Sequence, residues 1–354
     1  MNPIRILSAS AQVAAHLRTE LDRGRWSGGM PGANWLAAEL GVNRKTVVAA
    51  LRQLEKDGIL EGQGQGRNRR IIPPDGKTAR PMRIALLGHE PLVSTEGYLV
   101  ELQHLLLAAG HTAFFAKKSL QDLGMNVARV SSQVRQTEAD AWVVCSGSRE
   151  VLEWFCEQQL TAFALFGRRE GLPIAAIGPD KRPPVAAATR QLIGLGHRRI
   201  VLVARRVRRL PQPGRSERAF LDELDAHGVP VGDYNLPDWE ETTEGLQALL
   251  SSLFRVTPPT AMIIDEASLF AAVQQFLASH GIRVPQQVSL ICTDADPTFV
   301  WCSPSISHIR WDAGPVVRRI VRWAANVSIG REDVKQTFTA AEFVPGGTIG
   351  PCAK

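Results

Sequence analysis

The chain has 354 residues, of which 44% are hydrophobic and 21% are charged, and its formal net charge is +6. This length suffices for two or three domains, and the composition is typical of an ordinary soluble globular protein. Its cysteines form no CxxC pair and have no metal-ligand spacing, so we interpret them as reduced thiols of a cytoplasmic protein without a metal site: Cys145, Cys156, Cys292, Cys302 and Cys352.

The positive charge is concentrated near the N-terminus. Residues 1–81 contain 13 Lys and Arg against 7 Asp and Glu, whereas the other residues contain 28 of each kind. A protein that binds phosphate groups releases counterions, and this supplies most of its non-specific affinity for DNA. The sequence has neither a signal-peptide pattern nor a long apolar run. We therefore expect nucleic acid, and no membrane, as a partner of the N-terminal region.

The stretch 36–66 predicts two helices joined by a short turn. Gly41 can end the first helix in the left-handed conformation, and Asn43 can cap the second. The second helix would bury apolar residues spaced i, i+4 and i+7, which are Val47, Leu51 and Leu54. Its exposed first turn would then offer side chains to base edges in a major groove, namely Asn43, Arg44, Lys45 and Thr46. Taken alone, these residues also fit a plain surface helix.

A glycine-rich hairpin follows the second helix. Two short apolar segments, 59–60 and 71–72, enclose a basic turn that contains Gly64, Gly66 and Arg67. Such a turn could lie along the DNA backbone or the minor groove. The region therefore predicts a winged helix-turn-helix.

Residues 13–72 resemble the DNA-binding domain of the GntR family of bacterial transcription regulators. The resemblance rests on an N-terminal helix from Val13, on Pro31 before the first helix of the motif, on LAAELGVNRKTVVAALRQLEKDGIL and on a Gly-x-Gly wing. It implies a DNA-binding domain over residues 1–72. The chain departs from the family at residues 32–34, where Gly-Ala-Asn replaces the usual Ser-Glu-Arg, and at Val48, where an Arg often stands.

Residues 73–81, PPDGKTARP, predict a linker because they are rich in proline and polar residues. From residue 82 onward, short apolar strands alternate with helices of about ten residues, which is typical of an α/β fold with doubly wound parallel sheets. In such sheets ligands bind beyond the C-terminal ends of the strands. The predicted strands are 83–88, 113–116, 141–145, 162–166, 200–204, 261–265 and 288–293.

Four sequence segments resemble the effector domain of LacI-family repressors: Asp180-Lys181-Arg182, LGHRRIVLV at 195–203, SERAFLDELDAHGV at 216–229, and the stretch 258–296 that ends in GIRVPQQVSLICTDAD. The resemblance implies a periplasmic-binding-protein-like domain over 82–354. It implies two lobes that clamp a small molecule, often a sugar, and it implies a homodimer. We place the three crossings between the lobes near 178–184, 300–310 and 328–337.

The same resemblance suggests residues that contact the effector. Asp265 and Asp294 occupy strand ends that face the ligand in the family, and Arg215 or Arg218 is the candidate to replace the family's ligand-binding arginine. Independently of the resemblance, Arg205 begins a dense run of arginines directly after the strand 200–204, in a loop that either faces the cleft or is solvated or faces a partner subunit. Carboxylates and guanidinium groups suit a polyol, because carboxylates accept from two hydroxyls and guanidinium donates in a fork. An anionic effector held by the arginines is the alternative.

Tryptophans can provide stacking platforms for sugars, and Trp301 and Trp311 flank one of the predicted crossings. The sequence therefore predicts a transcription regulator, interpreted as a repressor, that is controlled by a sugar-like effector. No Walker A, HExxH, Gly-x-Ser-x-Gly or dinucleotide-binding motif occurs, so we expect neither an enzyme nor a cofactor. A solute-binding protein or a sugar-active enzyme with an appended helix-turn-helix is the alternative.

Overall fold

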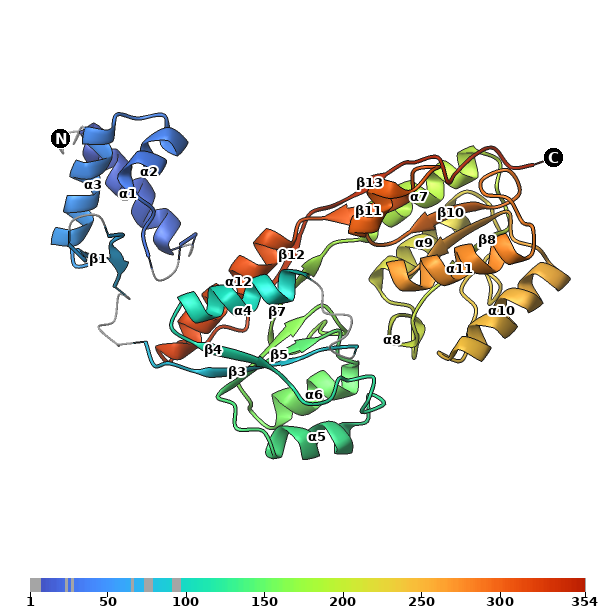
Figure 1. The fold of residues 1–354 in the computed structure, drawn as a ribbon, viewed down its shortest axis with the longest axis horizontal. Helices are drawn as coiled ribbons and strands as arrows, with labels where there is room; N and C mark the ends of the chain where they lie inside the picture. Colours follow the sequence, from blue (N-terminus) through green and yellow to red (C-terminus); the bar gives the residue numbers. More distant parts are fainter. Residues whose placement is uncertain are drawn as a thin grey trace, which may run out of the picture.

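A computed structural model describes residues 8–22, 25–26, 29–64, 67–72, 79–90 and 97–353. A small helical domain lies at one end of the molecule, and two α/β lobes form the rest (Figure 1). This arrangement confirms the predicted fold class. No helix in the described ranges is long and apolar enough to cross a membrane.

The N-terminal domain has a hydrophobic core of its own. Val47, Leu51 and Leu54 are buried as the helical spacing predicts, and they pack with Leu17 and Leu36. Gly41 ends the second helix with a φ of 62°, and the Asn43 side chain caps the third by accepting from the Lys45 N–H at 2.8 Å. The elements are α1 (Ala9–Asp22), α2 (Ala33–Leu40), α3 (Arg44–Lys56) and the hairpin strands β1 (Leu60–Glu61) and β2 (Arg70–Ile71).

The first lobe contains a parallel sheet of six strands in the order β12-β7-β6-β5-β3-β4. Side chains alternate between its faces: Ile84 and Leu86 pack with α4 and α12, whereas Ala85 and Leu87 pack with α5 and α6. The elements of this lobe are β3 (Arg83–Leu87), α4 (Gly97–Ala108), β4 (Thr112–Phe115), α5 (Val127–Arg135), β5 (Ala141–Cys145), α6 (Arg149–Glu157), β6 (Ala162–Leu165), β7 (Ala175–Pro179), α12 (Ala313–Ser328) and β12 (Gln336–Thr339).

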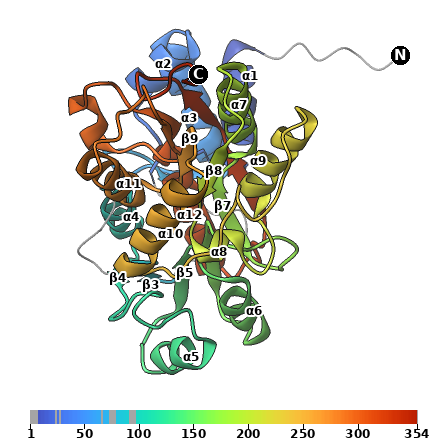
Figure 2. The same ribbon diagram turned by 90° about the vertical axis from the view of Figure 1, so that its right-hand side faces the viewer.

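The second lobe contains a five-stranded sheet in the order β13-β11-β10-β9-β8, in which only β13 runs antiparallel to its neighbour. Helices cover both faces, as Figures 1 and 2 show. The elements are α7 (Arg182–Gly194), β8 (Ile200–Val203), α8 (Arg206–Arg209), α9 (Arg215–Ala226), α10 (Thr243–Val256), β9 (Ala261–Ile264), α11 (Ala267–Ser279), β10 (Ser289–Cys292), η2 (Pro297–Trp301), β11 (Ser307–Trp311) and β13 (Ala341–Val344).

The chain passes between the lobes three times, and two passages differ from the predicted positions. The first joins β7 to α7 through residues 180–181. The second joins β11 to α12 at residue 312 rather than within 300–310, because 307–311 form a strand of the second sheet. The third joins β12 to β13 at residue 340 rather than within 328–337, because 336–339 form the edge strand of the first sheet.

Candidate functional site: a cleft between the lobes and an exposed helix-turn-helix

A cavity of about 1690 Å³ lies between the two lobes. Loops that follow the C-terminal ends of strands in both sheets line it, as expected for doubly wound sheets. The first lobe contributes the loop after β6, and the second lobe contributes the start of α9 and the loop after β10. The cavity is therefore the natural place for a small ligand.

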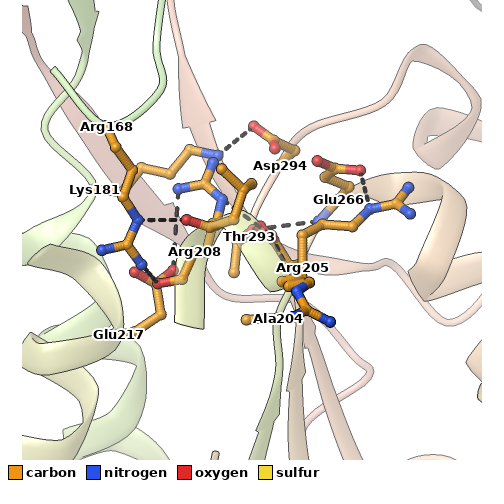
Figure 3. A network of polar contacts seen from close by, with 12 residues as sticks. Arg168, Lys181, Ala204, Arg205, Arg208, Glu217, Glu266, Thr293 and Asp294 are labelled. Atoms are coloured by element: carbon orange, nitrogen blue, oxygen red, sulfur yellow. Dashed lines mark hydrogen bonds and ion pairs between the residues drawn. The ribbon is translucent and has the colours of Figure 1, made fainter. Parts of the chain in front are cut away.

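Lys181 and Asp294 connect the first crossing to the second lobe inside this cavity. The Lys181 Nζ lies 2.8 Å from the Asp294 Oδ1, although 113 residues separate them in sequence (Figure 3). The Trp311 indole N–H donates to the same carboxylate oxygen at 3.0 Å. Asp294 therefore lines the cavity as predicted, and its carboxylate is already fixed in place by two donors.

Asp265 does not line the cavity, which corrects its assignment as a ligand contact. It is only 2% exposed, and its Oδ2 lies 3.0 Å from the Arg208 Nε. The Thr293 hydroxyl donates to its other oxygen at 2.9 Å. Burial opposes ionisation of Asp265, but Arg208, Lys181 and the Thr293 hydrogen bond together hold its pKa below the ordinary value. Asp265 therefore positions Arg208, which does line the cavity.

Arg205 also has a different position from the predicted one. Its guanidinium lies 2.9 Å from Glu90 in the first lobe and 2.9 Å from Glu266 in the second, and it is absent from the cavity lining. Burial and the neighbouring Asp265 raise the pKa of Glu266 to about 7. Arg205 is thus an ionic bridge between the lobes rather than a ligand contact.

A second bridge between the lobes comes from Arg168, a residue that sequence reasoning missed. Its guanidinium donates from the first lobe to the carbonyl oxygens of Arg208, at 2.6 Å, and Gln212, at 2.5 Å. Sequence alone gives no signal for these bonds, since backbone carbonyls accept them. Lys181, in contrast, could have been identified from the sequence, because it lies in the Asp-Lys-Arg segment that resembles the repressor effector domain.

Three aromatic rings meet beside the first lobe's side of the cavity. Tyr98, Phe166 and Trp311 line it and contact one another edge to face, with ring centroids 5.5 to 6.3 Å apart. Trp301, the predicted stacking residue, is 87% exposed on η2 and does not line the cavity. The structure thus places Trp301 away from the cavity, because η2 lies on the surface of the second lobe, whereas Trp311 ends a strand at the cleft.

Several cleft loops contain non-glycine residues in the left-handed backbone conformation, which L-residues with a side chain rarely adopt. Ser146, Phe166 and Glu266 each follow a strand, line the cavity and have φ between 51° and 63°. Such strain costs about 1–3 kcal/mol per residue and concentrates at functional sites. The loop after β6 continues with Gly167, whose φ is 73°.

We expect Gly167→Ala to lower the free energy of unfolding by about 2 kcal/mol, through left-handed strain and overpacking. A Cβ there would lie 2.6 Å from the Gly147 carbonyl oxygen. Gly171→Ala is the matched control, since Gly171 has a φ of 72° but no atom within 4 Å of an added Cβ. Calorimetric melting of both variants tests this. Equal losses in Tm would show that the contact with Gly147 has no effect.

The N-terminal domain exposes the residues predicted to face DNA. Asn43, Arg44 and Lys45 are exposed at the start of α3, and Thr46 is half-buried. In the hairpin, Gly64 and Arg67 are exposed, whereas Gly66 lies outside the described residues. Arg69 and Arg70 pair with Glu55 and Glu61, at 2.6 and 3.8 Å. The start of α3 is thus an exposed polar surface, backed by the buried face of the same helix.

Comparisons with protein families support both the N-terminal DNA-binding domain and the two-lobed domain. Residues 9–68 match the family described as bacterial regulatory proteins, gntR family, and residues 189–349 match the periplasmic binding protein-like domain. No curated protein sequence matches the chain.

Several solved structures share the fold. A LacI family transcriptional regulator from Enterococcus faecium with bound ribose is 16% identical, with a TM-score of 0.60 over 77% of this chain and 100% of that chain. A complex of the transcriptional regulator CelR with cellobiose is 17% identical, with a TM-score of 0.62 over 90% and 100%. A periplasmic binding protein/LacI transcriptional regulator from Alkaliphilus metalliredigens, complexed with D-xylulofuranose, is 14% identical, with a TM-score of 0.60 over 75% and 98%. The chain therefore joins a helix-turn-helix domain of the gntR family of bacterial regulatory proteins to a periplasmic-binding-protein-like domain with the fold of LacI-family regulators.

Proposed function

We infer that the chain is a cytoplasmic transcription repressor whose DNA binding is controlled by a small effector in the cleft. We assign operator binding to residues 1–72, a linker to 73–81, and effector binding and dimerisation to 82–354. One observation carries this proposal: a gntR-family domain with an exposed polar helix start is joined to a two-lobed domain that contains a large cavity.

The DNA contacts are assigned by position on α3 and the hairpin. The α3 helix offers its first turn to base edges, where arginine can donate in a fork to guanine. Gly64, Gly66 and Arg67 are assigned to the sugar-phosphate backbone or the minor groove. The excess of basic residues in 1–81 supports this, because phosphate contacts supply affinity for any DNA sequence.

We assign the effector to the cleft, and we propose that it is a sugar or a sugar derivative. Aromatic rings next to fixed polar groups are typical of sugar sites, and here Trp311 lies beside Asp294 and Lys181. Arg218 is exposed at the cavity wall and is proposed as a further contact. Similar structures contain ribose, cellobiose and D-xylulofuranose, which supports a sugar-like ligand.

Effector control is proposed to act through closure of the lobes. Ligand pockets usually have volumes of about 300–1,000 Å³, so the cavity of about 1690 Å³ leaves room for the lobes to close on a small molecule. In a homodimer, closure would change the spacing of the two DNA-binding domains. A dimer is supported by α4, whose Val100, Leu105 and Leu107 are apolar and exposed.

The test begins with the first turn of α3. We expect Arg44→Ala to weaken binding to a duplex selected from a random library by about 2 kcal/mol, because a bidentate base contact is lost. Arg44 is exposed, so folding should be unaffected. Lys56→Ala, at the far end of α3, removes the same charge and is the control. Fluorescence anisotropy at several salt concentrations measures both, and equal small losses would contradict a base contact by Arg44.

A further inference from the structure

Arg169 is a buried cation without a full set of partners. It lies in the loop after β6, is 8% exposed and lines the cavity. Its Nε and Nη2 atoms have no hydrogen-bond partner among the described residues. Burial and the nearby Arg215 lower the pKa of Arg169 to about 10, and Glu170 opposes this only in part. An unpaired buried guanidinium is costly, so its retention at a cavity wall requires an explanation.

The surroundings of Arg169 hold it in this position. Gln336 donates to its carbonyl oxygen at 2.9 Å, and its guanidinium carbon lies 4.9 Å from the centre of the Phe338 ring. Gly178 on β7 leaves the necessary room, because a Cβ there would lie 3.4 Å from both terminal nitrogens of Arg169. Arg169 is therefore fixed between two strands of the first sheet.

A second arginine from the other lobe lies on the same ring. The guanidinium carbon of Arg215, at the start of α9, is 4.7 Å from the centre of the Phe338 ring. No carboxylate lies within ion-pair distance of Arg169 or Arg215 in the part of the chain that the structure describes. Phe338 is 46% exposed and lines the cavity together with both arginines. Two positive charges from opposite lobes thus meet at one aromatic ring.

Most other cations of the cavity are already neutralised or solvated. Lys117 and Arg218 are exposed, so water screens their charge. Arg168 donates to backbone carbonyls. The remaining cations each have an acidic partner: Lys181 with Asp294, Arg208 with Asp265, Arg182 with Asp180 and Arg149 with Glu153. Arg169, which is buried, and Arg215, which is half-buried, are therefore the shielded cations of the cavity that have neither an ion-pair partner nor a backbone carbonyl acceptor among the described residues.

We propose that the effector carries an anionic group, a carboxylate or a phosphate monoester, which binds between Arg169 and Arg215 beside Phe338. A neutral sugar hydroxyl could accept a hydrogen bond there, but it could not offset two like charges. An oxyanion accepts from both guanidinium groups, and such charge-assisted bonds are the strongest that arginine makes. Because the arginines belong to different lobes, the anion would also favour lobe closure. This proposal rests on the effector-controlled function inferred above and names the chemical class of the effector.

The test uses the full-length protein and inorganic phosphate as the probe, with chloride at equal ionic strength as the reference. We expect calorimetry to detect phosphate binding, and Arg169→Gln and Arg215→Gln each to weaken it by about tenfold or more. Arg149→Gln is the matched control, because it removes an arginine of the same cavity that already pairs with Glu153. It should change phosphate affinity less than twofold.

Two further measurements separate the possible outcomes. D-gluconate and D-glucose 6-phosphate are compared with D-glucose, so that a carboxylate and a phosphate ester are distinguished from a neutral sugar. Operator binding without ligand should be unchanged in all three variants. Phosphate binding that is absent, or equal in the wild type and both variants, overturns the anion site, even when the protein binds its operator and a neutral sugar releases it. Failure of the wild type to bind any operator would instead overturn the proposed function.

Discussion

Arg208→Met should lower the free energy of unfolding by about 3–5 kcal/mol, because it leaves the buried Asp265 carboxylate without its cation. Asp265 is 2% exposed, and its remaining donors are the Thr293 hydroxyl and the Arg205 N–H, at 2.9 and 3.4 Å. Differential scanning calorimetry at pH 8 measures the effect. The control is Arg190→Met, which breaks the pair with Glu223 at a position where the arginine is 60% exposed. Such surface pairs contribute about 0–1 kcal/mol.

The pH dependence separates a lost charge pair from lost packing. In the wild type, Arg208 and its neighbours hold the pKa of Asp265 low, so this group stabilises the fold above its unfolded pKa and loses that effect only in acid. Without Arg208, burial should raise the pKa of Asp265 above the unfolded value. The folded variant then binds a proton as the pH falls, and the difference in Tm from the wild type should shrink between pH 8 and pH 5.

A second substitution checks the same cause. Asp265→Asn in the Arg208→Met background removes the uncompensated charge, and it should recover most of the lost stability at pH 8. If the double variant is as unstable as Arg208→Met, or if the loss in Tm is the same at both pH values, the role of Arg208 is packing rather than charge compensation.

The fold could be predicted from sequence because its determinants are local. The strands that the sequence predicts near 83, 141 and 261 are short apolar runs buried on both faces of a sheet. The helix α3 shows its buried face at helical spacing and its cap at Asn43. The edge strand β12 was missed because its residues, QTFT, are half-buried or exposed and lack an apolar run. That omission misplaced the third crossing.

The cleft could be predicted only in part, because its pairings join distant residues. Sequence places both Asp265 and Asp294 after strands, but it does not reveal that Arg208 covers the first and leaves the second at the cavity wall. The partner of Asp294 is Lys181, which lies 113 residues away. Whether a polar side chain faces a ligand or a buried partner depends on such tertiary contacts, and residue type and local spacing do not determine them.

Separating the two domains should reduce operator affinity by about 10²- to 10⁴-fold, because binding of the second half-site then ceases to be intramolecular. We compare residues 1–76, residues 82–354 and the full chain. The N-terminal fragment should fold alone, since Leu17, Leu36 and Leu51 are fully buried within that domain's own core. Fluorescence anisotropy with a two-half-site duplex measures affinity, and the full chain with a protease site in the linker, left uncut, is the control.

The larger fragment determines how the loss of affinity is interpreted. If 82–354 carries the dimer contact, it should sediment as a dimer at micromolar concentration while 1–76 remains a monomer.

Leu107→Asp in the full chain places a charge on the exposed apolar side of α4, where Leu107 is 66% exposed. If α4 forms the dimer interface, this charge should give a monomer with the low operator affinity of fragment 1–76. A monomeric 82–354, or a 1–76 fragment that binds within fivefold of the full chain, would contradict paired half-sites. The regulator would then bind its operator through one DNA-binding domain. Lobe closure would have to change DNA affinity by a mechanism other than the spacing of two such domains.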